Sequence, residues 1–513
     1  MFQTVSMGGR LLTALALSAS AVHAYPTVHD FGTTQLIQRD TLADCLSSAG
    51  VVTSLPSSAN WTADTESWNS RINPVPAVVV FPATEADITA SLKCATSSKT
   101  KVTTLGGNRS FQSQAWGRND GALIVNLVNM KVLTYDETSK VLTYGGPVMI
   151  SEVARYLWDN YQRTLPHGRC PDVGMTGVAA SGFGTLSRKA GSILDNIVGA
   201  RVALADGTVV DASADENADL FWAIRGAAPS FGVVVHFKIN TMDPPSNTVT
   251  NYTISFPTGY TPTQQDTVDA LIGTQKWALS TDNNDLLSIR FGLTKSPKLE
   301  GFFYGTSAEF TTVSKALLTY LPNMTIASNE NDFWTSEDIN TPGIATGTLT
   351  GRRFFYIAAI TVPSTAPLTN ATAWQLFSST AFATKPDDVG STGGFVDIWG
   401  GAYAKSVPAD LSAWKHDDNL LLIRHDMRSK TFDVAFSDAS LQIVRKNFYT
   451  FVDGYKAEGG TPGGFNTYRD AEWTADETAE YLYGTEGYAK LRTLKATYDA
   501  GELFNTDVQS VPV

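Results

Sequence analysis

Residues 166–184 read Pro-His-Gly-Arg-Cys-Pro-Asp-Val-Gly-Met-Thr-Gly-Val-Ala-Ala-Ser-Gly-Phe-Gly. The glycines and small residues of this stretch indicate a backbone that packs closely against a flat or phosphorylated group, or else a tight loop that crosses between strands. The stretch lacks the G-x-G-x-x-G pattern that opens a βαβ unit, which disfavours a dinucleotide-binding fold of that type. It also contains Cys170, the residue on which the functional interpretation depends.

The chain has three cysteines, and its N-terminus has the pattern of a secretory signal. Residues 1–24 carry one positive charge, then an apolar run, then small residues at an expected cleavage site, so we expect a secreted, extracellular protein. Secreted proteins usually pair their cysteines, so an odd one is bonded to another group or reactive. We expect a Cys45–Cys94 disulfide, with free thiols as the alternative, which leaves Cys170 for a cofactor.

Charge and hydropathy restrict the partners. The net charge of −12 argues against nucleic acid and anionic membranes, and no later apolar run is long enough to span a bilayer. We expect a monomer. Glycosylation sequons occur at five positions, which suits an extracellular glycoprotein: Asn60, Asn108, Asn251, Asn323 and Asn370.

A chain of 513 residues exceeds what one hydrophobic core usually supports, so two domains are expected. From residue 76 to residue 240, apolar strand-like runs alternate with helical patterns. Pro244-Pro245-Ser246-Asn247 has the composition of a boundary. Beyond it the patterns predict an antiparallel sheet flanked by helices, which makes the chain an α+β protein. The elements predicted there are strands at 251–256, 287–293, 308–312 and 354–362, and helices at 263–278 and 368–382.

A second glycine-rich loop follows the short strand predicted at 101–104. Gly106 and Gly107 allow backbone N–H groups to approach an anion closely, and Asn108, Arg109 and Ser110 supply further donors. A plain turn is the alternative for this loop.

Several motifs together carry a resemblance. They are Gly-Gly at 106–107, His-Gly-x-Cys-Pro-x-Val-Gly at 167–174, Val-Gly-Ala-x-Val-x-Leu-Ala-Asp-Gly at 198–207, Asn-Ala-Asp-Leu-Phe-Trp-Ala-Ile-Arg-Gly-Ala at 217–227, Phe-Gly-Val-Val at 231–234 and Phe-Asn-Thr-Tyr-Arg-Asp at 465–470. In this order the chain resembles the berberine-bridge-enzyme-like FAD-linked oxidoreductases of the vanillyl-alcohol-oxidase superfamily, which include secreted fungal oligosaccharide oxidases.

The resemblance implies a two-domain PCMH-type FAD-binding fold. Residues 25–245 and 446–513 would form the FAD-binding domain, and 246–445 the substrate domain. The residues expected to bind FAD are Gly106, Gly107, Asn108, Arg109, Ser110, Cys170, Val173, Gly174, Gly177, Ser181, Gly182 and Val233.

The family bonds its flavin twice, through the cysteine to C6 and through a histidine of the first loop to the 8-methyl carbon. This chain has Asn108-Arg109 where the histidine is expected. The resemblance therefore implies covalent attachment through Cys170 only, with a non-covalent flavin as the alternative. Val173 matches the position that gates oxygen access in relatives, which favours an oxidase and leaves a dehydrogenase as the second possibility.

Tyr468 and Asp397 match the catalytic positions of the family. A substrate hydroxyl must lose its proton as hydride leaves the adjacent carbon. A free phenol ionises only near about pH 10, so a carboxylate within hydrogen-bond reach would help a tyrosine to act as the base. Packing of Tyr468 and solvent exposure of Asp397 are the structural alternatives. Phe465 and Thr467 replace a tyrosine and an asparagine of the family motif.

Four further residues have open roles. Trp399 and Tyr403 can stack on sugar rings, or cover an apolar substrate or the core. His167 either lowers the pKa of the Cys170 thiol or caps the loop. His416, beside Asp417 and Asp418, is expected at the surface and not in a metal site, since no pattern in the chain has metal-ligand spacing.

Three functions are compatible with these residues. The first is a secreted oxidase that converts the anomeric carbon of an oligosaccharide to a lactone and uses O2. The second is an FAD-linked oxidase that tailors a secondary metabolite by alcohol oxidation or ring closure. The third is a binding glycoprotein that has lost activity, which the substitutions at Asn108, Phe465 and Thr467 keep open.

Overall fold

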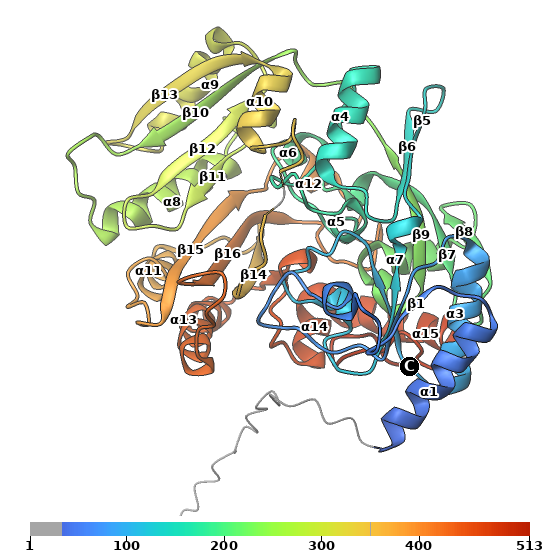
Figure 1. The fold of residues 1–513 in the computed structure, drawn as a ribbon. Coiled ribbons are helices and arrows are strands. Elements are labelled where there is room, and N and C mark those ends of the chain that lie inside the picture. Colours follow the sequence, from blue (N-terminus) through green and yellow to red (C-terminus); the bar gives the residue numbers. More distant parts are fainter. Residues whose placement is uncertain (1–32, 349) are drawn as a thin grey trace, which may run out of the picture.

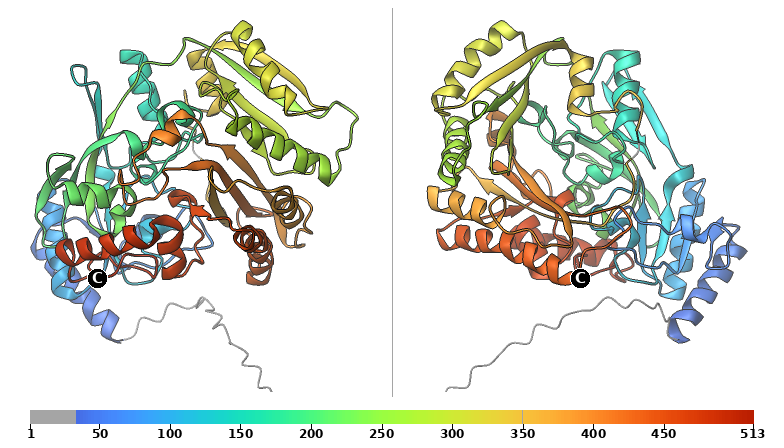
Figure 2. Two further views of the ribbon diagram at one scale, coloured as in Figure 1. Left: turned by 180° about the vertical axis from the view of Figure 1, so that it is seen from behind. Right: turned by 60° about the vertical axis from the view of Figure 1, so that its left-hand side comes forward.

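The computed structural model describes residues 33–348 and 350–513. The signal expected at 1–24 lies outside these residues. Figures 1 and 2 show a large twisted sheet with helices on its outer side, and beside it a region that combines smaller sheets with the N-terminal and C-terminal helices.

Two small sheets form the first region, which is the expected FAD-binding part. In one sheet, three buried strands run parallel and a short strand pairs antiparallel at the edge. Parallel strands are buried on both faces, which explains the continuous apolar runs. The order is β1 (Thr53–Ser54), β2 (Val78–Val80), β4 (Leu123–Asn126) and β3 (Val102–Leu105).

The second sheet is antiparallel and takes its strands from a longer stretch of chain. Its order is β5 (Val132–Asp136), β6 (Val141–Gly145), β9 (Val233–Asn240), β7 (Ile197–Ala203) and β8 (Val209–Ser213). The helices of this region are α1 (Thr33–Ser48), α2 (Trp61–Asp64), α3 (Glu85–Ser98), α4 (Ile150–Tyr161), α5 (Met175–Val178), α6 (Ser187–Ala190) and α7 (Ala218–Ala227).

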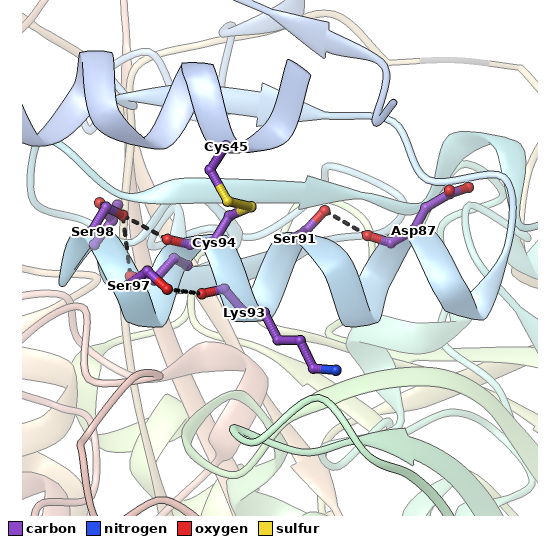
Figure 3. The surroundings of a disulfide bond; sticks show 9 residues. Cys45, Asp87, Ser91, Lys93, Cys94, Ser97 and Ser98 are labelled. Carbon is purple, nitrogen blue, oxygen red and sulfur yellow. Dashed lines mark hydrogen bonds between the residues drawn. A yellow bond between two sulfur atoms is a disulfide. The ribbon is translucent and has the colours of Figure 1, made fainter. Parts of the chain in front are cut away.

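The expected disulfide joins the first two long helices. Cys45 in α1 and Cys94 in α3 are bonded, as Figure 3 shows, and this confirms the predicted pairing. The α3 helix begins at a capping box in which Thr84 accepts from the backbone of Asp87, and it ends at Lys99 in the left-handed region. The bond therefore fixes α1 to a helix whose two ends are already well defined.

The second region contains an eight-stranded antiparallel sheet. Helices α8, α11 and α13 supply apolar side chains to the same core as the inner strands, which places that core on the helix-covered side of the sheet. The strand order is β13 (Thr325–Asp332), β10 (Thr248–Ser255), β12 (Lys298–Phe303), β11 (Arg290–Gly292), β15 (Val389–Ile398), β16 (Asn419–Ser429), β14 (Phe355–Pro363) and β17 (Gly463–Gly464). The helices are α8 (Gln264–Leu279), α9 (Ser307–Thr319), α10 (Phe333–Asn340), α11 (Asn370–Ser379), α12 (Ala402–Ser406) and α13 (Asp438–Ala457).

Two predictions for this region are wrong. Residues 308–312, predicted as a strand, lie in α9, because Thr306 and Glu309 form a capping box that starts a helix. The boundary expected at residue 445 falls inside α13, whose Phe448, Phe451 and Tyr455 pack in the core of the eight-stranded sheet. The second region therefore extends to the end of that helix.

The C-terminal segment returns to the first region. Helices α14 (Ala475–Leu482) and α15 (Gly484–Tyr498) follow β17, and α15 lies against α7. Leu503 and Phe504 enter the core beneath the parallel sheet, where the Val102 amide donates to the Leu503 carbonyl. Among the described helices, none combines the length and the apolar character that a membrane span requires.

Candidate active site

The two glycine-rich loops touch each other. A Cβ built on Gly107 would lie 2.5 Å from the Cα of Gly174, and a Cβ on Gly174 would lie 2.7 Å from the Cα of Gly107. Neither backbone can move aside, so only glycine at both positions permits this contact. Gly107 and Gly174 are far apart in the sequence, and in the fold their two loops form one continuous surface, called the glycine floor below.

A cavity opens over this floor, and most of the residues predicted to bind a cofactor line it. They are Gly106, Gly107, Asn108, Arg109, Ser110, Cys170, Val173, Gly174, Gly177 and Gly182. No hydrogen bond within the described residues uses the backbone N–H groups of residues 106–110. Free amide donors along a glycine loop are suited to an anionic or polar group.

Two of the predicted residues lie behind the wall of the cavity. Val233 is fully buried in the core beneath the parallel sheet, and its neighbour Val234 lines the cavity instead. Successive strand residues point to opposite faces, so in β9 the side chain of Val234 faces the cavity and that of Val233 faces the core. Ser181 is also fully buried, and its hydroxyl lies 3.0 Å from that of Thr467, which does line the cavity.

Cys170 is a free and exposed thiol on the cavity wall. Asn108, close by, has a positive φ of 49° and uses both ends of its amide. It donates to the Glu66 carbonyl (2.9 Å) and accepts from the Trp116 indole (2.8 Å). This sequon asparagine is thus engaged within the fold, while Asn323, for example, is exposed.

The side chain of Arg109, the next residue of the first loop, contacts three neighbouring side chains. Its guanidinium lies 3.3 Å from Asp172 and 4.2 Å from the Trp68 ring, and it donates to the Thr350 hydroxyl. Burial lowers the pKa of Arg109 against the opposing charge of Asp172. Asp172 also accepts from the Thr350 amide (2.6 Å), so a loop of the second region is bound to both glycine-rich loops.

Tyr468 projects into the same cavity from a short 3-10 turn, η5 (Asn466–Tyr468). Its ring lies 4.8 Å from that of Phe465 and 5.8 Å from that of Phe111. The guanidinium of Arg424 stands 4.8 Å from the Tyr468 ring centroid.

Asp397 is buried, and both its oxygens accept from Arg290 at 2.7 Å. In the described part of the chain no hydrogen bond joins Asp397 to Tyr468, so the expected direct pair is replaced by an ion pair. The Arg290 guanidinium lies over the Phe395 ring, and Arg424 lies over both that ring and the ring of Tyr468. Asp397 is therefore held beside the site through an arginine that the sequence analysis did not identify.

Two arginines that the sequence analysis missed border the site. Arg290 lies in β11, and Arg424 follows directly after the apolar run Leu420-Leu421-Leu422-Ile423 within β16. A charged residue inside a buried strand is costly unless it is paired or used. The position of Arg424 at the end of this run is the signal by which it could have been found.

Other predicted aromatics and histidines lie in the structural core. Trp399 is buried and packs against Phe183 and Trp414, so its ring is core and is not available for stacking on a sugar. His416, expected at the surface, is buried against Trp414 and its Nε2 lies 2.5 Å from Asp195. The expectation failed because the carboxylate comes from a segment far away in the sequence.

His167 is also buried, with its Nε2 2.9 Å from Glu337. Burial opposes the charged form, but the charge and hydrogen bond of Glu337 outweigh burial and raise the pKa of His167. Its other ring nitrogen lies 2.8 Å from the Gly168 carbonyl. These contacts hold the loop before Cys170 in place, which fits a structural role for His167.

Comparison with known proteins agrees with the geometry. Residues 76–213 match the FAD binding domain family. The carbohydrate oxidase of Microdochium nivale is 32% identical over 289 residues, which cover 56% of this chain and 58% of that protein. The glucooligosaccharide oxidase of Sarocladium strictum is 28% identical over 496 residues, or 93% of this chain and 95% of that protein. This chain is an FAD-linked oxidoreductase.

A solved structure extends the comparison to the cofactor. The glucooligosaccharide oxidase from Acremonium strictum, which carries a 6-S-cysteinyl, 8α-N1-histidyl FAD, matches with a TM-score of 0.80 at 27% identity and covers 92% of this FAD-linked oxidoreductase and 99% of its own chain. The residues present here suit FAD, because free backbone donors, the glycine floor and an exposed thiol meet in one cavity. The second attachment position is different, since this oxidoreductase has Asn108-Arg109 and no histidine in that loop.

Proposed function

We propose that this enzyme oxidises the anomeric carbon of an oligosaccharide to a lactone with O2 as the acceptor. The observation that carries the proposal is the convergence of the Cys170 thiol, the two glycine-rich loops and Tyr468 in one cavity. The oligosaccharide oxidase from Sarocladium strictum aligns with nearly the whole chain, including the second region, which supports a sugar as substrate. Secretion, for which residues 1–24 carry the signal pattern, fits an extracellular sugar.

Cys170 is proposed as the residue that attaches FAD covalently, and the only one. Arg109 takes the place of the second attachment residue and is engaged with Asp172 and Thr350. The backbone of residues 106–110 and 174–182 would hold the cofactor. When bound, FAD supplies the acceptor for a hydride and passes both electrons to O2, which leaves as hydrogen peroxide.

Tyr468 is proposed as the base. The substrate loses a proton from its hydroxyl and a hydride from the adjacent carbon, so a group must hold that proton at the cavity wall. The phenol of Tyr468 lines the cavity and would accept that proton, with the guanidinium of Arg424 over its ring. Asp397 would act as a positioning residue, because it fixes Arg290, which packs on the same Phe395 ring as Arg424. Val173, on the cavity wall, is proposed to leave access for O2.

The test is hydrogen peroxide release during a screen of neutral and acidic oligosaccharides. We expect release with at least one, and a fall of about 10²–10⁴-fold in kcat/KM for Tyr468→Phe, the usual contribution of a positioned base. Tyr488→Phe, in α15 away from the cavity, is the matched control and retains activity. Reduction of the flavin by a sugar without peroxide under air would replace O2 by another acceptor, and no reduction by any sugar would direct the search to secondary-metabolite alcohols.

A further inference from the structure

Six arginines gather beside Tyr468 and Cys170. Arg109, Arg169 and Arg424 line the cavity together with Cys170 and Tyr468, and Arg290 pairs with Asp397 beside it. Arg353 lies over the same Trp68 ring as Arg109, and Arg428 shares Asp426 with Arg424. The arginine cluster is thus Arg109, Arg169, Arg290, Arg353, Arg424 and Arg428.

The carboxylates around this cluster do not balance it. Asp172 pairs with Arg109 at 3.3 Å, and Asp397 pairs with Arg290 at 2.7 Å. Asp426 is shared by Arg424 at 2.8 Å and Arg428 at 3.5 Å. In the part of the chain that the structure describes, Arg169 and Arg353 have no carboxylate at ion-pair distance.

The cluster also retains unused hydrogen-bond donors. The Nε–H groups of Arg109, Arg169, Arg353 and Arg424 are buried and have no acceptor among the described residues. Burial lowers the pKa of Arg169 to about 10, helped by the charge of Arg290. An unpaired guanidinium with a buried donor is costly, so the presence of Arg169 in the cavity lining indicates a ligand that pairs with it.

We propose that the substrate carries a carboxylate, which binds Arg169 on the wall of the cavity. This inference rests on the proposed function, and it defines the sugar as an acidic one, such as a uronic acid. A guanidinium matches a carboxylate through two parallel hydrogen bonds, which gives direction as well as charge. The alternative partner of these arginines is the flavin itself, which gains negative charge when it is reduced, and the experiment separates the two.

The experiment measures binding, so it does not depend on turnover. Purified holoenzyme is titrated with digalacturonic acid and with galactobiose, and tryptophan fluorescence is followed, because Trp68 stacks with Arg109 and lies near Arg353. Digalacturonic acid is expected to bind at least tenfold more tightly, and roughly 0.5 M NaCl should reduce this preference only in part, because buried charge pairs are screened less than exposed ones. Galactose 6-sulfate and galacturonic acid, each compared with galactose, test which acid the cluster selects.

Variants locate the effect. Arg169→Gln should weaken binding of the acid by at least tenfold and leave binding of the neutral sugar unchanged. Arg352→Gln is the matched control, because Arg352 adjoins the cluster but pairs with Glu66 at 2.7 Å. Arg169→Lys keeps the charge and should retain much of the preference, which guards against loss of folding as the cause.

Equal binding of acidic and neutral sugars would overturn the inference, and so would stronger selection of sulfate than of carboxylate. An equal loss of binding of both sugars in Arg169→Gln would also overturn it, because the cluster would then be assigned to the flavin. Failure of the proposed function would give a different experimental result. If no sugar is oxidised but the acid is still selected, the carboxylate site stands and the reaction assigned to it does not.

Discussion

At the scale of single residues, the site depends on a contact that no side chain makes. Gly107 and Gly174 meet backbone to backbone and join the loop after β3 to the loop that contains Cys170. Each loop alone has the composition of an ordinary turn. Their contact turns them into a continuous surface on which a large cofactor can lie.

Replacement of Gly107 by alanine tests this contact. A Cβ at 2.5 Å from the Cα of Gly174 forces the loops apart, so we expect partial loss of bound FAD and a destabilisation of about 1–3 kcal/mol. The ratio of flavin to protein absorbance and the thermal midpoint measure both effects. Gly501→Ala, whose Cβ meets nothing within 4 Å, is the control. Full flavin content at an unchanged midpoint in Gly107→Ala would show that the floor is not needed.

Residue identity was easier to predict than residue direction. The glycine-rich loops were found from their composition, Cys170 from the odd number of cysteines, and Tyr468 from the family resemblance. Val233 and Asp397 were placed in the site although one faces the opposite core and the other is bound to Arg290. Which face a strand residue occupies, and which partner a carboxylate meets, depend on segments that fold against it from elsewhere in the chain.

At the scale of elements, His416 joins the segment before β16 to a turn of the FAD-binding region through Asp195. Burial opposes the charged form of His416, but the charge and hydrogen bond of Asp195 outweigh burial, so the pKa of His416 is raised. A histidine with a raised pKa in the folded protein stabilises fully below its unfolded value of about 6.5 and loses that contribution as pH rises through the folded value.

The consequence is a pH-dependent effect of His416→Gln. The variant should be less stable than the wild type by a larger margin at about pH 5.5 than at about pH 9, because only the lower pH retains the charged pair. Thermal midpoints of both proteins at the two pH values provide the comparison. An equal difference at both would mean that His416 contributes packing on Trp414 alone.

The disulfide bond between α1 and α3 is expected to stabilise the folded protein. The Cys45–Cys94 bond spans 49 residues, and a loop of that length corresponds to a gain of about 4 kcal/mol in the chain-entropy model. Chemical denaturation with and without a thiol reductant should therefore give a lower free energy of unfolding for the reduced protein. The double variant Cys45→Ser/Cys94→Ser should match the reduced protein and no longer respond to reductant.

At the scale of the whole molecule, the cavity is built by three parts of the chain. The first region supplies the glycine floor and Cys170, the eight-stranded sheet supplies Arg424, and the C-terminal return supplies Phe465, Thr467 and Tyr468. Composition and pattern were enough to predict an α+β protein with two regions. They were not enough to find the arginine cluster, whose members come from separate strands and loops and share no motif.

The central claim is that Cys170 alone bonds FAD to this protein. Intact-mass measurement of the acid-denatured enzyme tests it directly. We predict a wild-type mass that is heavier than the polypeptide by one FAD, and a Cys170→Ala mass that equals the bare polypeptide, with flavin recovered in the supernatant. A wild-type protein without the added mass, or a Cys170→Ala protein that keeps it, would contradict the account.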